Sequence, residues 1–228
     1  MPSTAVTYRA ALPGLIALPG VYRPQADTLL LADALAREPL RPGAQVVEIG
    51  TGTGAIALRA AARGAEVTAV DVAWPAVLAA RLNGWRRRLR LRVLHGDFAA
   101  RTRGRRFDLV LANPPYVPGP DVRLPGSGAR RAWEAGPEGR AVIDRICVAA
   151  PALLRPGGVL LMVHSGMCGT QKTLALLAGQ GMAARITQRV RIPWGPVLRA
   201  RGAWLRAEGL ARDGDEHEEL VVVRAEYP

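Results

Sequence analysis

A loop with glycine at every second position is the first candidate for chemistry in this 228-residue chain. Residues 46–54 read Val-Val-Glu-Ile-Gly-Thr-Gly-Thr-Gly, so an apolar run delivers Glu48 to a loop containing Gly50, Gly52 and Gly54. Glycine lets the backbone turn tightly and lets a ligand approach without a Cβ in the way. A helical pattern follows, and the free N–H groups at a helix start favour an anionic ligand group. The sequence predicts a ligand site here, with a plain strand-to-helix turn as the alternative.

The spacing of the glycines indicates which ligand fits. A dinucleotide site requires G-x-G-x-x-G, whereas position 55 is alanine and the third glycine falls one place early. Glu48, directly before the loop, is unfavourable for a pyrophosphate but attracts an ammonium group. We therefore expect S-adenosylmethionine, which carries such a group at its methionine end, to be the cofactor.

Two more acidic residues follow predicted strands. The strand at 66–70 leads to Asp71, and the strand at 91–94 leads to Asp97 and then Phe98. Ligands of open α/β sheets bind outside the carboxyl ends of the strands, so we expect these residues and Glu48 to meet at one edge. There Asp71 would accept from two ribose hydroxyls, and Asp97 from an adenine amino group that packs on Phe98. Taken singly, each acidic residue could equally be a loop cap.

The second motif, Asn113-Pro114-Pro115-Tyr116, follows a predicted strand at 107–112. Its two prolines restrict the backbone and remove N–H donors, which leaves carbonyl oxygens free to accept. Asn113 adds a side-chain carbonyl and Tyr116 an aromatic wall. This pattern predicts a rigid pocket for a planar –NH2 group, and a strand-ending turn is the alternative.

The rest of the pattern predicts an α/β fold with seven strands, mostly parallel, and helices on both faces of the sheet. We expect an irregular N-terminal arm at 1–20 and a single domain at 21–228 with an insert at about 193–217. A helix from about 27 to 36 is either a cover for the sheet or, with Tyr22, Pro24 and Thr28, a lid over the ligand. Residues 117–131, rich in Pro, Gly and Arg, also predict a lid.

Composition excludes some classes of protein and leaves others open. The net charge is +12, but only Lys172 among 31 basic residues is lysine, and this bias is typical of a G+C-rich coding sequence. The arginine clusters at 86–90 and 101–106 indicate either a solvated face or a contact surface for RNA or a ribonucleoprotein. The two cysteines and three histidines lack metal-ligand or triad spacing, so we expect no metal. We find no membrane span or signal peptide and expect a cytoplasmic protein.

These motifs together resemble the HemK/PrmC family of S-adenosylmethionine-dependent N-methyltransferases. The resemblance is strengthened by V-Y-x-P-x-x-D-T-x-L-L at 21–31 and A-W-x-x-G-x-x-G-R-x-V-x-D-R at 132–145, and it is greatest to the short eukaryotic and archaeal branch. It implies a Rossmann-like class I methyltransferase fold. It also implies methylation of the glutamine in the Gly-Gly-Gln motif of peptide-chain release factors.

The resemblance assigns two sets of site residues. Those expected to hold the cofactor are Tyr22, Pro24, Thr28, Glu48, Gly50, Gly52, Asp71, Asp97, Phe98 and Asn113. Those expected to hold the substrate amide are Asn113, Pro114 and Tyr116. Two rival activities share this chemistry: N-methylation of an exocyclic amine in RNA or DNA, and N-methylation of a small molecule or peptide. A binding module without enzymatic activity fits less well, because every cofactor position is chemically intact.

Short-branch members commonly pair with a small zinc-binding activator that extends the sheet edge and covers an apolar surface. In this sequence the region around the predicted strand at 91–94 is instead dense in arginine, at positions 86, 87, 88, 90 and 92. These charges argue against an apolar partner surface. We therefore expect a subunit that is soluble without an activator.

Overall fold

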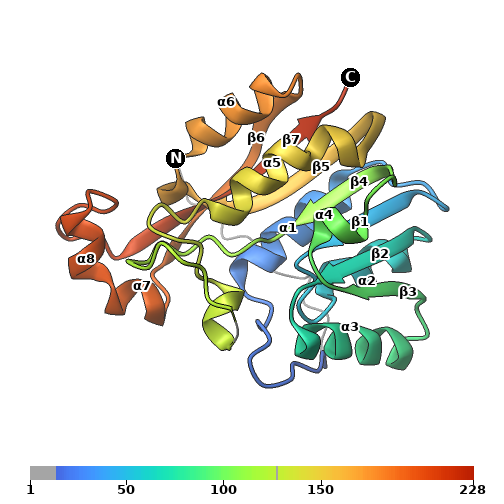
Figure 1. Ribbon diagram of the computed structural model, residues 1–228, viewed down its shortest axis with the longest axis horizontal. Helices are drawn as coiled ribbons and strands as arrows, with labels where there is room; N and C mark the ends of the chain where they lie inside the picture. The colour runs from blue at the N-terminus through green and yellow to red at the C-terminus, as the bar shows by residue number, and fades with distance from the viewer. Residues whose placement is uncertain (1–13, 127) are drawn as a thin grey trace.

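A twisted sheet in the order β3-β2-β1-β4-β5-β7-β6 forms the centre of the molecule (Figure 1). The computed structural model describes residues 14–126 and 128–228, so most of the predicted N-terminal arm lies outside the described residues. Within them the sheet has seven strands, of which β7 runs antiparallel to both of its neighbours. The strands are β1 (Gln45–Ile49), β2 (Glu66–Asp71), β3 (Leu91–His95), β4 (Phe107–Ala112), β5 (Leu154–Ser165), β6 (Ala183–Pro193) and β7 (His217–Glu226). The predicted fold class is confirmed.

Helices cover both faces of this sheet because its central strands are apolar on both sides. Val46 belongs to the core beneath α1 (Ala26–Arg37), α2 (Ala55–Ala62) and α3 (Trp74–Arg86). Its neighbour Val47 belongs to the opposite core, beneath α4 (Phe98–Arg101), α5 (Ala141–Leu153) and α6 (Thr170–Gly179). This alternation of side chains along a strand places the two helical layers on opposite faces.

The segment predicted as an insert at 193–217 contains two short helices, α7 (Pro196–Ala200) and α8 (Gly202–Ala207). They pack around a small apolar cluster of Trp194, Leu198 and Leu205 at one end of the sheet (Figure 1). Two short 3-10 helices, η1 (Ala129–Ala132) and η2 (Gly166–Cys168), complete the described elements together with α4. The sequence did not predict η1, η2 or α4, because each is too short to show a hydrophobic period.

The expectation that arginines leave no apolar surface near β3 is wrong. On α3, next to that edge strand, Trp74, Leu78, Leu82 and Trp85 are exposed, with Trp85 at 77%. Their spacing of three or four residues places them along one side of the helix, which we call the α3 stripe. Of the arginines in that expectation, Arg86 is the last residue of α3 and Arg92 lies on β3, whereas Arg87, Arg88 and Arg90 follow the end of the helix.

The glycine loop joins β1 to α2 and requires a conformation that other residues adopt at a cost. Gly54 has φ +80°, and a Cβ there would lie 3.2 Å from the Ala80 Cβ and 3.3 Å from its Cα. The loop thus lies against α3, which stabilises its position at the sheet edge.

We predict that Gly54→Ala lowers the free energy of unfolding by more than Gly43→Ala does. Gly43 has the same φ of +80°, but a Cβ added there would meet no atom within 4 Å, so it isolates the backbone cost of about 1–2 kcal/mol. The excess at Gly54 reports the contact with Ala80. Urea unfolding of both variants measures the difference, and equal losses would show that the contact contributes nothing.

Candidate active site

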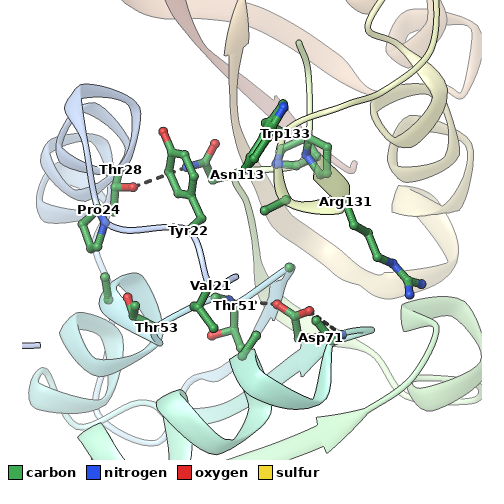
Figure 2. A pocket seen from close by; sticks show the side chains of 18 of the residues that line it. Val21, Tyr22, Pro24, Thr28, Thr51, Thr53, Asp71, Asn113, Arg131 and Trp133 are labelled. Atoms are coloured by element: carbon green, nitrogen blue, oxygen red, sulfur yellow. Dashed lines mark hydrogen bonds between the residues drawn. The ribbon is translucent and has the colours of Figure 1, made fainter. Parts of the chain in front are cut away.

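An open cavity lies beyond the carboxyl ends of β1, β2 and β4, where the sequence placed the ligand. It encloses about 980 Å³ of space between atoms, part of it continuous with solvent, which suits a nucleoside-sized ligand. Figure 2 shows Tyr22, Thr28 and Asn113 grouped on one side of the cavity and Asp71 on the other. The predicted site residues that line it are Tyr22, Pro24, Thr28, Glu48, Gly50, Gly52, Asp71, Asn113, Pro114 and Tyr116.

Asp71 holds the glycine loop in place from the end of β2. Its Oδ2 accepts a hydrogen bond from the Gly52 N–H at 2.9 Å, and its Oδ1 accepts from the Ala73 N–H at 2.9 Å. Burial raises the pKa of the Asp71 carboxyl, although these backbone donors partly offset the rise. Each oxygen keeps a lone pair, so Asp71 can still accept from a ligand hydroxyl.

Glu48 lies beneath the loop with 3% of its surface exposed. It accepts from the Thr51 hydroxyl and from the Ala57 N–H, the latter at 3.1 Å. Burial raises the pKa of Glu48 to about 8, with the Thr51 hydrogen bond opposing the shift. No arginine or lysine of the described residues forms an ion pair with Glu48 or Asp71, although the charge of Arg131 in the same cavity lowers the pKa of Asp71. A cationic group bound beside Glu48 would favour its ionised form.

Asp27, in the first turn of α1, is a site residue that the sequence assignment missed. Its Oδ2 accepts from the Tyr22 hydroxyl at 2.8 Å and from the Tyr116 hydroxyl at 3.1 Å. Its Oδ1 accepts from the Thr28 N–H at 2.5 Å and from the Thr28 hydroxyl at 3.2 Å. The D-T pair inside the 21–31 motif was the available signal, but the helical pattern alone made Asp27 an ordinary first-turn residue.

The Asn113–Tyr116 segment forms the other side of the cavity. The Asn113 Nδ2 donates to the Thr28 Oγ1 at 3.4 Å, as the dashed line in Figure 2 marks. Behind it, the buried Cys168 thiol donates to the Tyr116 carbonyl at 3.1 Å, which anchors the end of the motif. The Asn113 side chain is therefore tied through its amino end.

Asp97 and Phe98 are not among the residues that line the cavity. Asp97 caps α4 by accepting from the Ala99 and Ala100 N–H groups, and its other oxygen pairs with Arg145 at 2.6 Å. The same guanidinium lies over the Phe98 ring, 5.3 Å from its centre. Their role at the adenine stays a prediction, and capping of α4 accounts for the geometry of Asp97.

Residues in and just after the predicted lid also line the cavity. Arg131 and Trp133, labelled in Figure 2, contribute their side chains, with Gly128 and Ala132 beside them. The next residue, Glu134, is buried and receives the guanidinium groups of Arg130 at 2.7 Å and Arg201 at 3.0 Å. Arg201 follows α7, so the 193–217 segment is tied to the wall of the cavity.

Neither a metal site nor a membrane-spanning helix is found among the described residues. They contain no group of three or more His, Cys, Asp or Glu side chains placed to hold a metal ion. None of the helices in the described ranges has the length and hydrophobicity of a transmembrane segment.

Comparison with known proteins identifies the class to which this fold and site belong. Residues 14–125 match the methyltransferase small domain. The fold resembles Encephalitozoon cuniculi Mtq2 from its complex with Trm112, with TM-score 0.64, 24% identity, and coverage of 92% of this chain and 99% of that one. It also resembles Thermus thermophilus 16S rRNA N2 G1207 methyltransferase, with TM-score 0.59, 28% identity, and coverage of 93% of this chain and 46% of that one. The fold is that of a class I methyltransferase.

Sequence relatives narrow the class to a family. A protein N5-glutamine methyltransferase of Methanocaldococcus jannaschii is 31% identical over 181 residues, which cover 79% of this chain and 90% of that protein. Release factor glutamine methyltransferase of Bordetella pertussis is 37% identical over 173 residues, covering 72% of this chain and 63% of the relative. The chain thus spans less than two thirds of this bacterial relative. It belongs to the protein N5-glutamine methyltransferase family, and the resemblance to HemK/PrmC is confirmed.

The raised pKa of Glu48 predicts a pH dependence of stability. A carboxyl whose pKa rises from 4.5 when unfolded to about 8 when folded favours folding in its protonated form. Its contribution is complete below pH 4.5 and is lost as the pH rises through 8. Relative to Glu48→Gln, the wild type should therefore lose more than about 1 kcal/mol between pH 5 and pH 8.

Urea unfolding across this pH range measures the difference. Glu66→Gln, which changes a carboxyl at the exposed start of β2, is the control. A difference between wild type and Glu48→Gln that stays constant with pH would contradict the prediction.

Proposed function

We propose that this protein uses S-adenosylmethionine to methylate a glutamine side-chain amide, and that its acceptor is the Gly-Gly-Gln motif of a peptide-chain release factor. The supporting observation is that one cavity combines the buried carboxyl groups of Glu48 and Asp71 with the Asn113–Tyr116 segment. The name of the archaeal relative supports a protein glutamine as the acceptor, and the name of the bacterial relative supports a release factor. Because release factors act on ribosomes, we also propose a cytoplasmic location.

The residues of the cavity fit this cofactor chemically. Glu48 would hold the ammonium group and Asp71 the ribose hydroxyls, while Val72 and Ala76 offer an apolar surface to the adenine. The backbone at Gly50 and Gly52 would approach the ligand without a Cβ in the way. Tyr22, Pro24 and Thr28 would close over the methionine end. When bound, S-adenosylmethionine supplies a methyl group made electrophilic by its sulfonium.

The chain itself would contribute orientation and exclusion of water. A glutamine amide nitrogen is a weak nucleophile because its lone pair is delocalised into the carbonyl. The Asn113 Oδ1 and the Pro114 carbonyl would accept from its two N–H groups, and Tyr116 would pack against its plane. The acceleration of methyl transfer would then come from holding the nitrogen in line with the methyl group in a site closed to water. The amide can lose its extra proton after transfer.

We predict that the protein transfers label from S-adenosylmethionine to a release factor but not to a release factor with Gln→Glu in the motif. Asn113→Ala should reduce this transfer by at least about 10²-fold, because the acceptor loses its orienting partner. The dissociation constant for S-adenosylmethionine, measured by calorimetry, should remain nearly unchanged. RNA and DNA serve as parallel acceptors, and label entering nucleic acid alone would reject the proposal. Equal loss of transfer and of cofactor affinity would make Asn113 a cofactor residue instead.

We further propose that a small partner subunit covers the α3 stripe and extends the sheet at β3. Support comes from the exposed apolar side chains on α3 and from the place of β3 at the sheet edge. Trp74 stacks on His95 of β3 at 4.1 Å between ring centres, so stripe and strand form one surface. The structural relative Mtq2 is found in complex with Trm112.

We predict that the protein isolated from its natural source carries a stoichiometric zinc-containing subunit. Leu78→Ser with Trp85→Ser should remove that subunit while leaving S-adenosylmethionine binding intact, since the stripe lies outside the cavity. Native mass spectrometry and zinc analysis measure both effects. A wild-type chain that is isolated alone, monomeric and fully active would overturn the proposal.

A further inference from the structure

Asp27 is a buried carboxylate with no cationic partner in the described chain. Only 2% of its surface is exposed, and four hydrogen-bond donors point at its two oxygens. Three of those donors belong to side chains that line the cavity: Tyr22, Thr28 and Tyr116. Placing an unpaired carboxylate in the interior is costly, so its partners must make strong, directed hydrogen bonds.

The Asp27 carboxylate determines the direction of a chain of hydrogen bonds. An ionised carboxylate only accepts, so the hydroxyl proton of Thr28 is used in the bond to Oδ1 of Asp27. The Thr28 oxygen is then left as an acceptor, and it takes an N–H from Nδ2 of Asn113. A side-chain amide can present either its oxygen or its amino group, and here the amino group is held by Thr28. The Asn113 oxygen is thereby left for the cavity.

Asp27 also fixes the hydroxyl protons of Tyr22 and Tyr116. Both hydroxyl protons point to Oδ2 of Asp27, so neither is available as a donor to a ligand. Burial raises the pKa of both phenols well above the ordinary value, and the charge of Asp27 adds to the shift, so they keep those protons. Glu218 of β7 is the other carboxyl that acts on this group, and one of its oxygens, Oε2, has no hydrogen-bond partner in the described residues.

We propose that Asp27 is a positioning residue: through Thr28 it fixes the Asn113 amide with its oxygen toward the acceptor. The site is then committed to acceptors that bring N–H donors, and an acceptor offering only a carbonyl or carboxylate oxygen is rejected. This inference rests on the proposed function for its effect on catalysis. The hydrogen-bond chain itself is independent of which acceptor is used.

The alternative is that Asp27 serves only the fold, as a first-turn residue of α1. The two readings differ in what happens when the carboxylate becomes an amide of the same shape. In Asp27→Asn the amino group takes one of the two oxygen positions. At the Oδ1 position it gives up the bond from Thr28 N–H, donates to the Thr28 oxygen and reverses the chain. At the Oδ2 position it faces the two tyrosine hydroxyls, and the Thr28 hydroxyl keeps only a neutral, weaker acceptor. A reversed chain would turn the Asn113 amino group toward the acceptor.

The test compares Asp27→Asn with Asp33→Asn, which removes a half-exposed carboxylate from the same helix outside the cavity. We expect Asp27→Asn to lower kcat for the release factor by about 10²-fold, the scale of a misoriented reactant. The dissociation constant for S-adenosylmethionine should change by less than about threefold, as for an interaction that acts on the chemical step. Thr28→Val should produce a similar fall in kcat, and the double variant little more, because both break one chain. Asp33→Asn should behave as wild type.

Glu218→Gln distinguishes an effect of Asn113 orientation from an effect of nearby negative charge. It removes a neighbouring carboxyl without touching the hydrogen-bond chain, so it should retain most of the activity that Asp27→Asn loses. Equal loss in Glu218→Gln and Asp27→Asn would overturn the proposal in favour of a general charge effect. Wild-type kcat in Asp27→Asn, or a parallel loss of cofactor affinity, would also overturn it.

A readout that needs no acceptor keeps this inference separate from the proposed function. The side-chain NH2 signals of Asn113, assigned in ¹⁵N-labelled protein with Asn113→Asp, should exchange slowly with solvent in the wild type. In Asp27→Asn they should shift and exchange faster, whereas in Asp33→Asn they should be unchanged. Unaltered signals in Asp27→Asn would refute the hydrogen-bond chain even if the release factor is methylated. Altered signals in an enzyme that ignores the release factor would refute only the acceptor.

Discussion

The burial of three carboxyl groups, at the ends of β1 and β2 and in the first turn of α1, is the constraint on which the rest of this site depends. Glu48, Asp71 and Asp27 are buried, and none forms an ion pair with an arginine or lysine of the described residues, although the charge of Arg131 acts on Asp71. Buried carboxylates are stable only when many donors point at them. The donors here are loop N–H groups and hydroxyls, so the same hydrogen bonds that satisfy the charges also fix the glycine loop and the tyrosines.

The two layers of helices that cover the sheet support different sides of the cavity. The layer of α1, α2 and α3 supplies Asp27, the loop after β1 and the wall after β2. The layer of α5 and α6 lies behind the Asn113–Tyr116 segment, where the Cys168 thiol contacts the Tyr116 carbonyl. The residues proposed to hold the cofactor and the acceptor are thus supported from opposite faces of the sheet, and they meet at its carboxyl edge. That meeting point is where open α/β sheets bind their ligands.

Glu134 connects this site to the 193–217 segment, which contains α7 and α8. It is fully covered and holds two guanidinium groups, one from η1 and one from the residue between α7 and α8. Arg201 also donates to the Pro118 carbonyl at 2.6 Å, just after the Asn113–Tyr116 segment. The 193–217 segment therefore packs against residues that follow the Asn113–Tyr116 segment and the Trp133 wall of the cavity, although it lies far from them in the chain.

The sequence alone determined the α/β fold, the family and most of the cavity, because those depend on local signals. Apolar runs of strand length, glycines at fixed spacing and acidic residues at strand ends are short-range patterns, and the parallel sheet brings them together without further information. Only the tertiary structure decided what joins them across the chain. Asp27 and Tyr116 are 89 positions apart, and their hydrogen bond leaves no period in the sequence. The same reason explains the ion pair between Asp97 and Arg145, 48 positions apart, and the α3 stripe, whose exposure depends on which helical face the sheet leaves uncovered.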